Sequence, residues 1–90
     1  MKYRINFTKR ADSHVKIILK SGNKADISKF FKIIEELEKH PSTGIGNPEQ
    51  LKYELSGFWS RKLNQKDRLI YQILEEEVIV IVVSALGHYK

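Results

Sequence analysis

The second half of this 90-residue chain carries four side chains whose types could support chemistry if the fold brings them together. Glu49 follows Pro48 at the exit of a glycine-containing loop, where the backbone is extended and a carboxylate can point into a cleft. Arg68 opens a predicted strand, and His88 and Tyr89 end the chain after an apolar stretch. Together they would combine groups that transfer protons with a cation that stabilises negative charge.

Each of these residues also has a simpler interpretation. A single Glu on a surface is most often solvated, which is the default for Glu49. Arg68 would commonly form a surface ion pair with Asp67 or Glu75, and such pairs contribute little. His88 differs in its setting, since a terminal Gly-His-Tyr after a buried strand would be tied down rather than frayed.

The other histidines and the aromatic pair favour surface or core positions. His14 and His40 lie on predicted helices among charges, so we assign both to the surface, and Phe58 and Trp59 are expected in the core rather than as base-stacking platforms. No two histidines have a metal-ligand spacing, and the chain has no cysteine and no phosphate-binding loop. We therefore expect neither a metal nor a cofactor.

The chain is basic, with a net charge of +5 and a pI near 9.5. Residues 1–24 hold seven cations and a single anion, Asp12, which favours a polyanionic partner; an acidic protein would fit as well as a nucleic acid. The longest apolar run, Val78–Val83, is far shorter than the roughly 18 residues of a membrane-spanning helix. We expect one domain over residues 1–90, located in the cytoplasm and without a membrane partner.

The first half of the chain predicts a strand and two helices. Tyr3, Ile5 and Phe7 alternate with polar residues, as in a strand with one buried face. Thr8 can cap a helix of about Lys9–Ser21, whose apolar residues fall on one stripe.

The second helix is expected to start at Asp26, a capping residue, and to end at His40, because Pro41 forbids continuation. Residues 42–48 form a loop by composition, since two glycines and a proline interrupt every periodicity.

After this loop the pattern is typical of strands joined by short turns. The expected strands are Leu51–Leu55, Phe58–Leu63, Arg68–Leu74 and Val78–Val83. The last is apolar on both faces, which suits a strand inside the sheet. The order predicts an α+β fold: a strand, then two helices packed on one face of a mostly antiparallel sheet of four or five strands.

Four segments of the second half form a specific combination: Gly-Ile-Gly-Asn-Pro-Glu-Gln-Leu-Lys (44–52), Leu-Ser-Gly-Phe-Trp-Ser-Arg (55–61), Arg-Leu-Ile-Tyr (68–71) and the terminal His-Tyr (88–89). In these motifs the chain closely resembles the YoeB/Txe toxins of the RelE-like superfamily. The resemblance implies a RelE-like microbial RNase fold, consistent with the strand and two helices that precede the motifs.

The resemblance also implies an activity, that of an endoribonuclease from a bacterial type II toxin–antitoxin pair that cuts mRNA in the ribosomal A site. In that family the residue matching Glu49 is the general base, the residue matching His88 the general acid, and the arginine matching Arg68 stabilises the phosphate. Tyr89 matches a residue that helps to position the substrate. Metal-independent cleavage needs these groups, because the 2′-hydroxyl must lose a proton and the leaving 5′-oxygen must gain one.

Several basic residues surround these elements and are expected to contact mRNA or ribosomal RNA phosphates. They are Lys52, Arg61, Lys62 and Lys66, with Lys9 and Arg10 on the first helix extending the surface. Two positions depart from the family pattern, because Leu86-Gly87 stands where a basic residue is common and Lys66 where some relatives have an acid.

The implied partners are a cognate antitoxin of the YefM/Axe type, the 70S ribosome with its mRNA, and a second copy of the chain in a homodimer. Two alternatives remain open from the sequence. One is a toxin of the same fold that inhibits DNA gyrase without cutting RNA, as ParE does, and the other is a basic scaffold with a purely structural tail.

Overall fold

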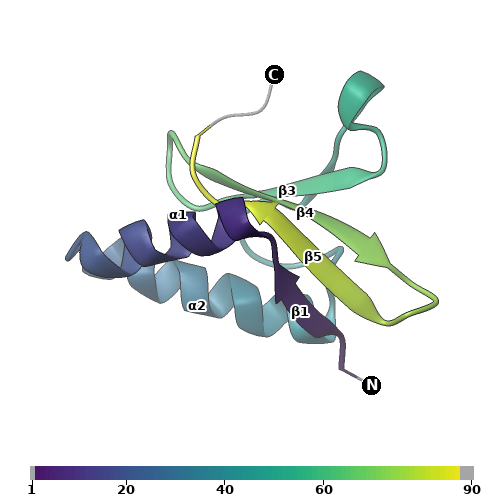
Figure 1. Ribbon diagram of the computed structural model, residues 1–90, viewed down its shortest axis with the longest axis horizontal. Helices are drawn as coiled ribbons and strands as arrows, with labels where there is room; N and C mark the ends of the chain where they lie inside the picture. The colour runs from purple at the N-terminus through teal and green to yellow at the C-terminus, as the bar shows by residue number, and fades with distance from the viewer. Residues whose placement is uncertain (1, 88–90) are drawn as a thin grey trace.

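The computed structural model describes residues 2–87, which form a five-stranded sheet and two α-helices (Figure 1). The elements in chain order are β1 (Arg4–Phe7), α1 (Lys9–Lys20), α2 (Lys24–Lys39), β2 (Glu49–Gln50), the 3₁₀ helix η1 (Tyr53–Leu55), β3 (Phe58–Lys62), β4 (Arg68–Leu74) and β5 (Ile79–Ser84). This order confirms the expected strand, two helices and later strands of an α+β fold. In the described residues, neither helix is long and apolar enough to cross a lipid bilayer.

The sheet has the strand order β1-β5-β4-β3-β2. β1 pairs in parallel with β5, and the other three pairs are antiparallel. The interior position expected for the apolar run is confirmed, since β5 lies between β1 and β4. Both of its edges are therefore hydrogen-bonded, which keeps a strongly β-forming segment from acting as an open edge.

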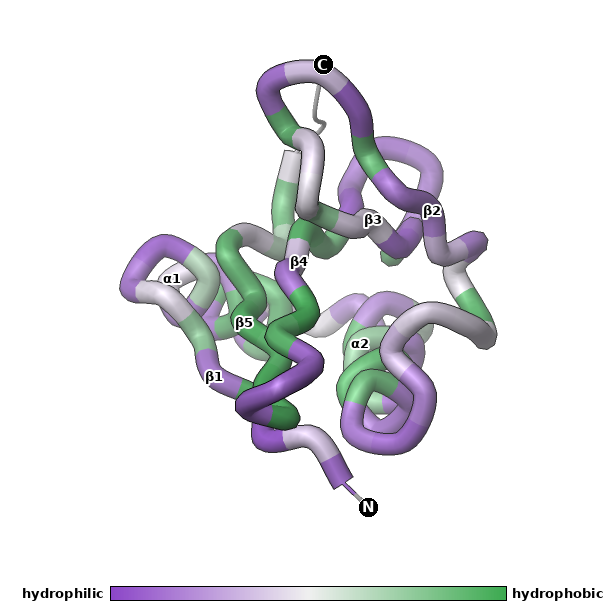
Figure 2. Tube along the Cα trace, turned by 90° about the vertical axis from the view of Figure 1, so that its right-hand side faces the viewer, coloured by the Kyte–Doolittle hydropathy of each residue, from purple (hydrophilic) through white to green (hydrophobic). Residues whose placement is uncertain are grey.

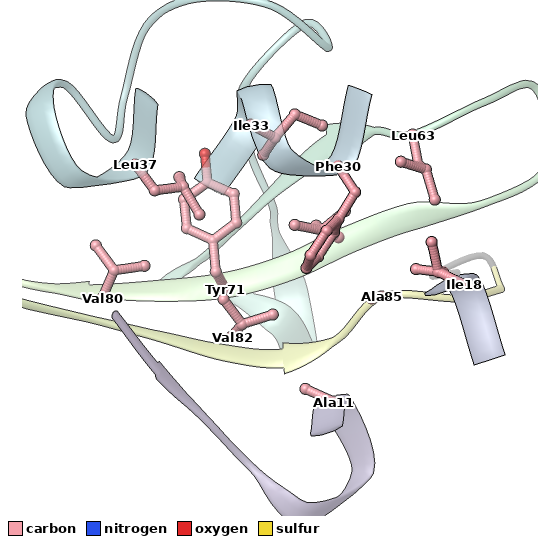
Figure 3. Packing of buried hydrophobic residues seen from close by; sticks show 11 residues of the cluster. Ala11, Ile18, Phe30, Ile33, Leu37, Leu63, Tyr71, Val80, Val82 and Ala85 are labelled. Carbon is pink, nitrogen blue, oxygen red and sulfur yellow. The ribbon is translucent and has the colours of Figure 1, made fainter. Parts of the chain in front are cut away.

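Both helices contribute to one hydrophobic cluster on a single face of the sheet, and in Figure 1 they lie together below β3 and β4. The cluster contains Ala11, Ile18, Phe30, Ile33, Leu37, Leu63, Leu69, Tyr71, Val80, Val82 and Ala85, most of which Figure 3 labels. Figure 2 shows apolar residues concentrated along β4 and β5 in the middle of the molecule. Trp59 packs against this cluster, as the core interpretation predicted. Phe58, also expected in the core, is half-buried at the preceding position of β3 and therefore on the other face. Phe7 on the edge strand remains 38% exposed.

The helix starts are set by side-chain caps. Thr8 caps α1 as expected, with its Oγ accepting a hydrogen bond from Ala11 N. The expected start of the second helix at Asp26 is wrong, because Asn23 is the cap and its Oδ1 accepts from Asp26 N. The helix therefore begins at Lys24, and the Asp26 carboxylate instead accepts a hydrogen bond from Asn64.

The strand expected over Leu51–Leu55 is also wrong. β2 ends at Gln50, and the segment that follows forms η1, in which Tyr53 has a φ of +59° that an extended chain cannot adopt. β5 likewise begins one residue later than expected, because Val78, with a φ of +58°, belongs to the preceding turn. β4 matches its predicted bounds.

Candidate active site

The pairing register of the sheet brings Glu49 and Arg68 onto the same face. Glu49 pairs with Ser60 and Ser60 with Ile70, so these three form one row across β2, β3 and β4. Arg68 lies two residues from Ile70 on β4, and side chains two residues apart on a strand share a face. Strand spacings of about 4.8 Å and rises of about 3.3 Å per residue put the two Cα atoms about 12 Å apart.

This face is the one opposite the helices. Arg61 and Tyr71 occupy the alternate positions of β3 and β4, and Arg61 reaches Glu36 on α2. Successive residues of a strand point to opposite faces, so Glu49 and Arg68 point away from the helical layer. Glu49 is exposed and Arg68 is half-buried, and both make polar interactions. The expected combination of a carboxylate and a guanidinium is thus placed on one surface.

The loop that delivers Glu49 to this surface is held by Arg61 from below. The Arg61 guanidinium donates to three carbonyl oxygens of the loop: those of His40 at 3.0 Å, Thr43 at 2.6 Å and Ile45 at 3.2 Å. Its Nη1 also forms an ion pair with Glu36 Oε1 at 2.6 Å. A buried cation that satisfies three backbone oxygens replaces the regular secondary structure that this loop lacks.

The same network includes Glu36 and Tyr71. Burial, the largest influence, raises the pKa of Glu36, but the hydrogen bond from Ile45 N and the Arg61 guanidinium outweigh it and lower the pKa overall. Burial raises the pKa of Tyr71, and its Oη accepts from Arg61 Nε at 3.1 Å and donates to Pro41 O at 2.8 Å.

Glycine is required at position 44 because of this packing. Gly44 has a φ of +123°, and a Cβ there would overlap the Glu36 carboxylate. Next along the loop, Gly46 O accepts a hydrogen bond from Lys62 N at 2.6 Å, which joins the loop to β3. The glycine pair therefore serves close packing of the loop on α2 and β3.

Arg61 itself does not contact RNA, so that expectation is corrected. Its side chain is fully buried, and the five hydrogen bonds described above occupy its donors. A phosphate cannot reach a guanidinium inside the core without breaking the loop. Arg61 and Lys62 are adjacent basic residues and look equivalent in the sequence. Because side chains alternate along β3, only Lys62 points to the face of Glu49 and Arg68.

The described chain ends beside Arg68. Arg68 N donates to Gly87 O at 3.1 Å, and Gly87 N donates to Asp67 Oδ1 at 2.9 Å. The other Asp67 oxygen accepts from Asn64 Nδ2 at 3.1 Å. His88 and Tyr89, the expected acid and positioning residue, lie outside the described residues.

His14 is not the surface residue that we expected. It is half-buried on α1, and its Nδ1 accepts hydrogen bonds from Ala85 N at 3.0 Å and from Leu86 N at 3.3 Å. Burial, then the charge of Arg10, lowers the pKa of His14, while Asp67 opposes the change. His14 therefore joins the first helix to the segment that follows β5.

The remaining basic candidates are exposed. Lys62 pairs with Arg68 and shares its face, Lys52 lies in the loop after β2, and Lys66 lies in the turn between β3 and β4. Lys9 and Arg10 are exposed in the first turn of α1. Within residues 2–87 no group of three or more His, Asp or Glu side chains is arranged to hold a metal ion.

Sequence patterns missed four residues that organise this site: Glu36, Tyr71, Asp67 and His14. Glu36 and Tyr71 have ordinary positions in an amphipathic helix and an alternating strand, so nothing local distinguishes them. Asp67 was considered only as an ion-pair partner for Arg68. The apolar stripe of the first helix predicts which of its residues face the core, but it does not distinguish His14 from the charged residues around it.

The two helices packed on one face of this sheet define the fold of the RelE-type toxins. RelE in its complex with RelB from Pyrococcus horikoshii superposes with a TM-score of 0.75 at 19% identity, over 97% of this chain and 96% of that one. The family model for the YoeB-like toxin of bacterial type II toxin–antitoxin systems matches residues 7–89. The chain therefore belongs to the YoeB-like toxin family.

Two relatives within this family are informative. Toxin YoeB of Synechocystis sp. is 41% identical over 58 residues, which cover 64% of this chain and 65% of that protein, slightly less than two thirds of its length. YoeB of Staphylococcus aureus superposes over 99% of this chain and 100% of that one at 27% identity, with a TM-score of 0.81 in a heterotetrameric YoeB–YefM complex and 0.83 in a YoeB dimer.

Proposed function

We propose that the protein is a ribosome-dependent endoribonuclease that cleaves mRNA in the ribosomal A site without a metal ion. The observation that carries this proposal is the common sheet face of Glu49 and Arg68, beside which the described chain ends at Gly87. His88 follows Gly87 directly in the sequence. Membership of a toxin family whose members are generally endoribonucleases supports the same conclusion.

The proposed reaction is an attack of the 2′-oxygen on the adjacent phosphorus. Glu49 removes the proton from the 2′-hydroxyl, the new P–O bond forms as the P–O5′ bond breaks, and His88 protonates the leaving 5′-oxygen. Arg68 stabilises the negative charge that builds on the non-bridging oxygens, and Tyr89 positions the substrate. The products are a 2′,3′-cyclic phosphate and a free 5′-hydroxyl, so atoms and protons balance without a metal or a cofactor.

The charge of the site face suits an RNA substrate. Lys62 stands next to Arg68 on this face, and Lys52 lies exposed in the loop that follows Glu49. Cations at these positions attract phosphates and would hold the mRNA beside Glu49 and Arg68. Lys66, Lys9 and Arg10 are proposed to extend the contact to ribosomal RNA.

The proposed partners follow from the family. S. aureus YoeB forms a complex with YefM and also forms a dimer. We propose that a YefM-like antitoxin neutralises this protein and that the toxin can form a homodimer. We also propose that residues 1–90 make up a single toxin domain that acts in the cytoplasm, where ribosomes and mRNA are located.

The test is primer extension on a defined mRNA translated by purified bacterial ribosomes. The wild type should cut at A-site codons only when ribosomes are present. Glu49→Gln and His88→Ala should each lower the cleavage rate by about 10²- to 10⁴-fold. Glu54→Gln, an exposed carboxylate change in η1, is the matched control and should leave the rate unchanged.

Two outcomes would overturn the proposal. If the wild type makes no cuts, or if folded Glu49→Gln cuts at the wild-type rate, the nuclease assignment fails. Growth arrest that persists in the Glu49 and His88 variants would point instead to a non-nucleolytic target such as gyrase. For the metal question, a phosphorothioate at the scissile phosphate that slows cleavage and is rescued by Mn²⁺ would contradict a metal-free reaction.

A further inference from the structure

The segment after β5 is clamped by groups from two other elements. Ala85 N and Leu86 N both donate to the Nδ1 of His14 on α1, at 3.0 Å and 3.3 Å. One residue further, Gly87 is bonded to the Asp67 carboxylate and to the Arg68 amide. The backbone that leads to His88 is therefore held at every residue from 85 to 87.

The His14 contact has a chemical requirement that the others lack. Backbone amides can only donate, so an Nδ1 that serves two of them must present a lone pair. The imidazole is then neutral, with its proton on Nε2. A proton added to Nδ1 would abolish both hydrogen bonds. The ring would then place its own N–H donor against the N–H groups of Ala85 and Leu86.

We propose that His14 is a positioning residue that holds the Ala85–Gly87 segment in place for catalysis by His88, and that this hold is released when His14 is protonated. The inference rests on the proposed nuclease function and goes beyond it by giving the site a built-in dependence on pH. His14 does not touch the substrate in this scheme and acts only through the backbone that leads to His88.

The charges around His14 favour the clamped state near neutral pH. Arg10 lies one turn before it on α1, and Asp67 faces it from the turn between β3 and β4, while the segment after β5 presents the backbone N–H groups of Ala85 and Leu86. Burial and then Arg10 lower the pKa of His14 below 6.5, with Asp67 opposing. In the folded protein His14 therefore stays neutral at pH values at which the histidine of an unfolded chain begins to take up a proton. The hydrogen bonds to Ala85 and Leu86 are lost only as the pH falls further.

The experiment compares the wild type with His14→Ala and His14→Asn in the ribosome cleavage assay. Asn Oδ1 occupies the place of Nδ1 and accepts hydrogen bonds but does not titrate, so it is the matched rescue variant. We expect His14→Ala to lower the rate at saturating ribosomes by about 10- to 100-fold, because a catalytic group displaced by about 1 Å can cost that much. The ribosome concentration at half-maximal rate should stay within about twofold, since the RNA contacts are untouched.

The pH profile separates positioning from simple stability. The rate ratio of wild type to His14→Asn should be constant above pH 7 and should decrease as the pH falls below 6.5. Titration of the other groups cancels in this ratio. A ratio that stays flat from pH 7.5 down to the pH at which the wild type starts to unfold would overturn the protonation part of the inference.

A readout that does not depend on activity tests the clamp itself. Amide hydrogen exchange at Ala85 and Leu86 should be slow in the wild type and in His14→Asn and fast in His14→Ala, with thermal melting used to confirm that all three are folded. Equal exchange or equal cleavage rates in wild type and His14→Ala would overturn the inference and leave the nuclease proposal intact. A wild type that does not cut at all would overturn both.

Discussion

Replacing Arg61 with alanine should lower the free energy of unfolding by about 3–5 kcal/mol, the cost typical of breaking a buried ion pair by removing one partner. The Arg61 side chain is fully buried, and its donors serve the Glu36 carboxylate, Tyr71 Oη and three loop carbonyls. Removing them leaves several acceptors unsatisfied, each at a cost of about 1–3 kcal/mol when water cannot enter.

Partial hydration keeps the total loss of stability in Arg61→Ala below the sum of these separate costs. The Glu36 side chain is 24% exposed and keeps its hydrogen bond from Ile45 N, so part of its loss is recovered by water. Tyr71 keeps its bond to Pro41 O. Arg61→Lys retains the charge but not the planar set of guanidinium N–H donors, so its free energy of unfolding should fall by about half as much as that of Arg61→Ala.

Equilibrium urea unfolding, followed by Trp59 fluorescence and circular dichroism, measures the effect. A loss of 3–5 kcal/mol would lower the urea midpoint by roughly 2–4 M. Lys62→Ala, the exposed neighbour on the opposite face of β3, is the control and should change stability by less than about 0.5 kcal/mol. A loss below about 1 kcal/mol in Arg61→Ala would refute the reasoning, because it would mean that the buried network is dispensable.

Three further changes probe the loop and the site face. Gly44→Ala should lower the free energy of unfolding by more than about 2 kcal/mol, because left-handed backbone strain adds to overlap with Glu36. Gly57→Ala has open space around it and should lose only the strain energy of about 1–2 kcal/mol. Equal losses of stability in urea titrations of the two variants would exclude the overlap. Because the pKa of Glu36 is lowered in the folded protein, its ionised form stabilises the fold fully above the ordinary pKa of 4.5 and progressively less as the pH falls through the folded pKa. The stabilities of wild type and Glu36→Gln should therefore converge in acid. A difference in stability that does not change with pH would count against this. Lys62→Ala should weaken ribosome binding and reduce the salt dependence of log K by about 0.7–1, and an unchanged slope would remove Lys62 from the phosphate contacts.

Much of the fold could be predicted because its signals are local. The alternation of β1, the Thr8 cap and the β-branched run of β5 each depend on neighbours in the chain. The structure contains all three elements, although Phe7 on the expected buried face of β1 is exposed. The errors arose where two local signals competed. Asn23 and Asp26 are both capping residues, and the alternation after Gln50 gave no sign of the positive φ at Tyr53.

The candidate site could be predicted only in part. The types of Glu49 and Arg68 and the motif resemblance pointed to one site, but the sheet register decides that both lie on the face away from the helices. The same register reverses the expectation for Arg61, which differs from Lys62 by one position and therefore by one face.

The sequence by itself determined the family, the order of elements and the residue types available for chemistry, because motifs, periodicity and caps are properties of adjacent residues. Only the tertiary structure decided what Arg61 and His14 do. Their hydrogen bonds join positions 10 to 72 residues apart, and most of these contacts form only when the helices and the loop after α2 close over the sheet. A buried cation and a histidine acceptor look like surface charges until the chain around them is folded, since burial and partner geometry determine their roles.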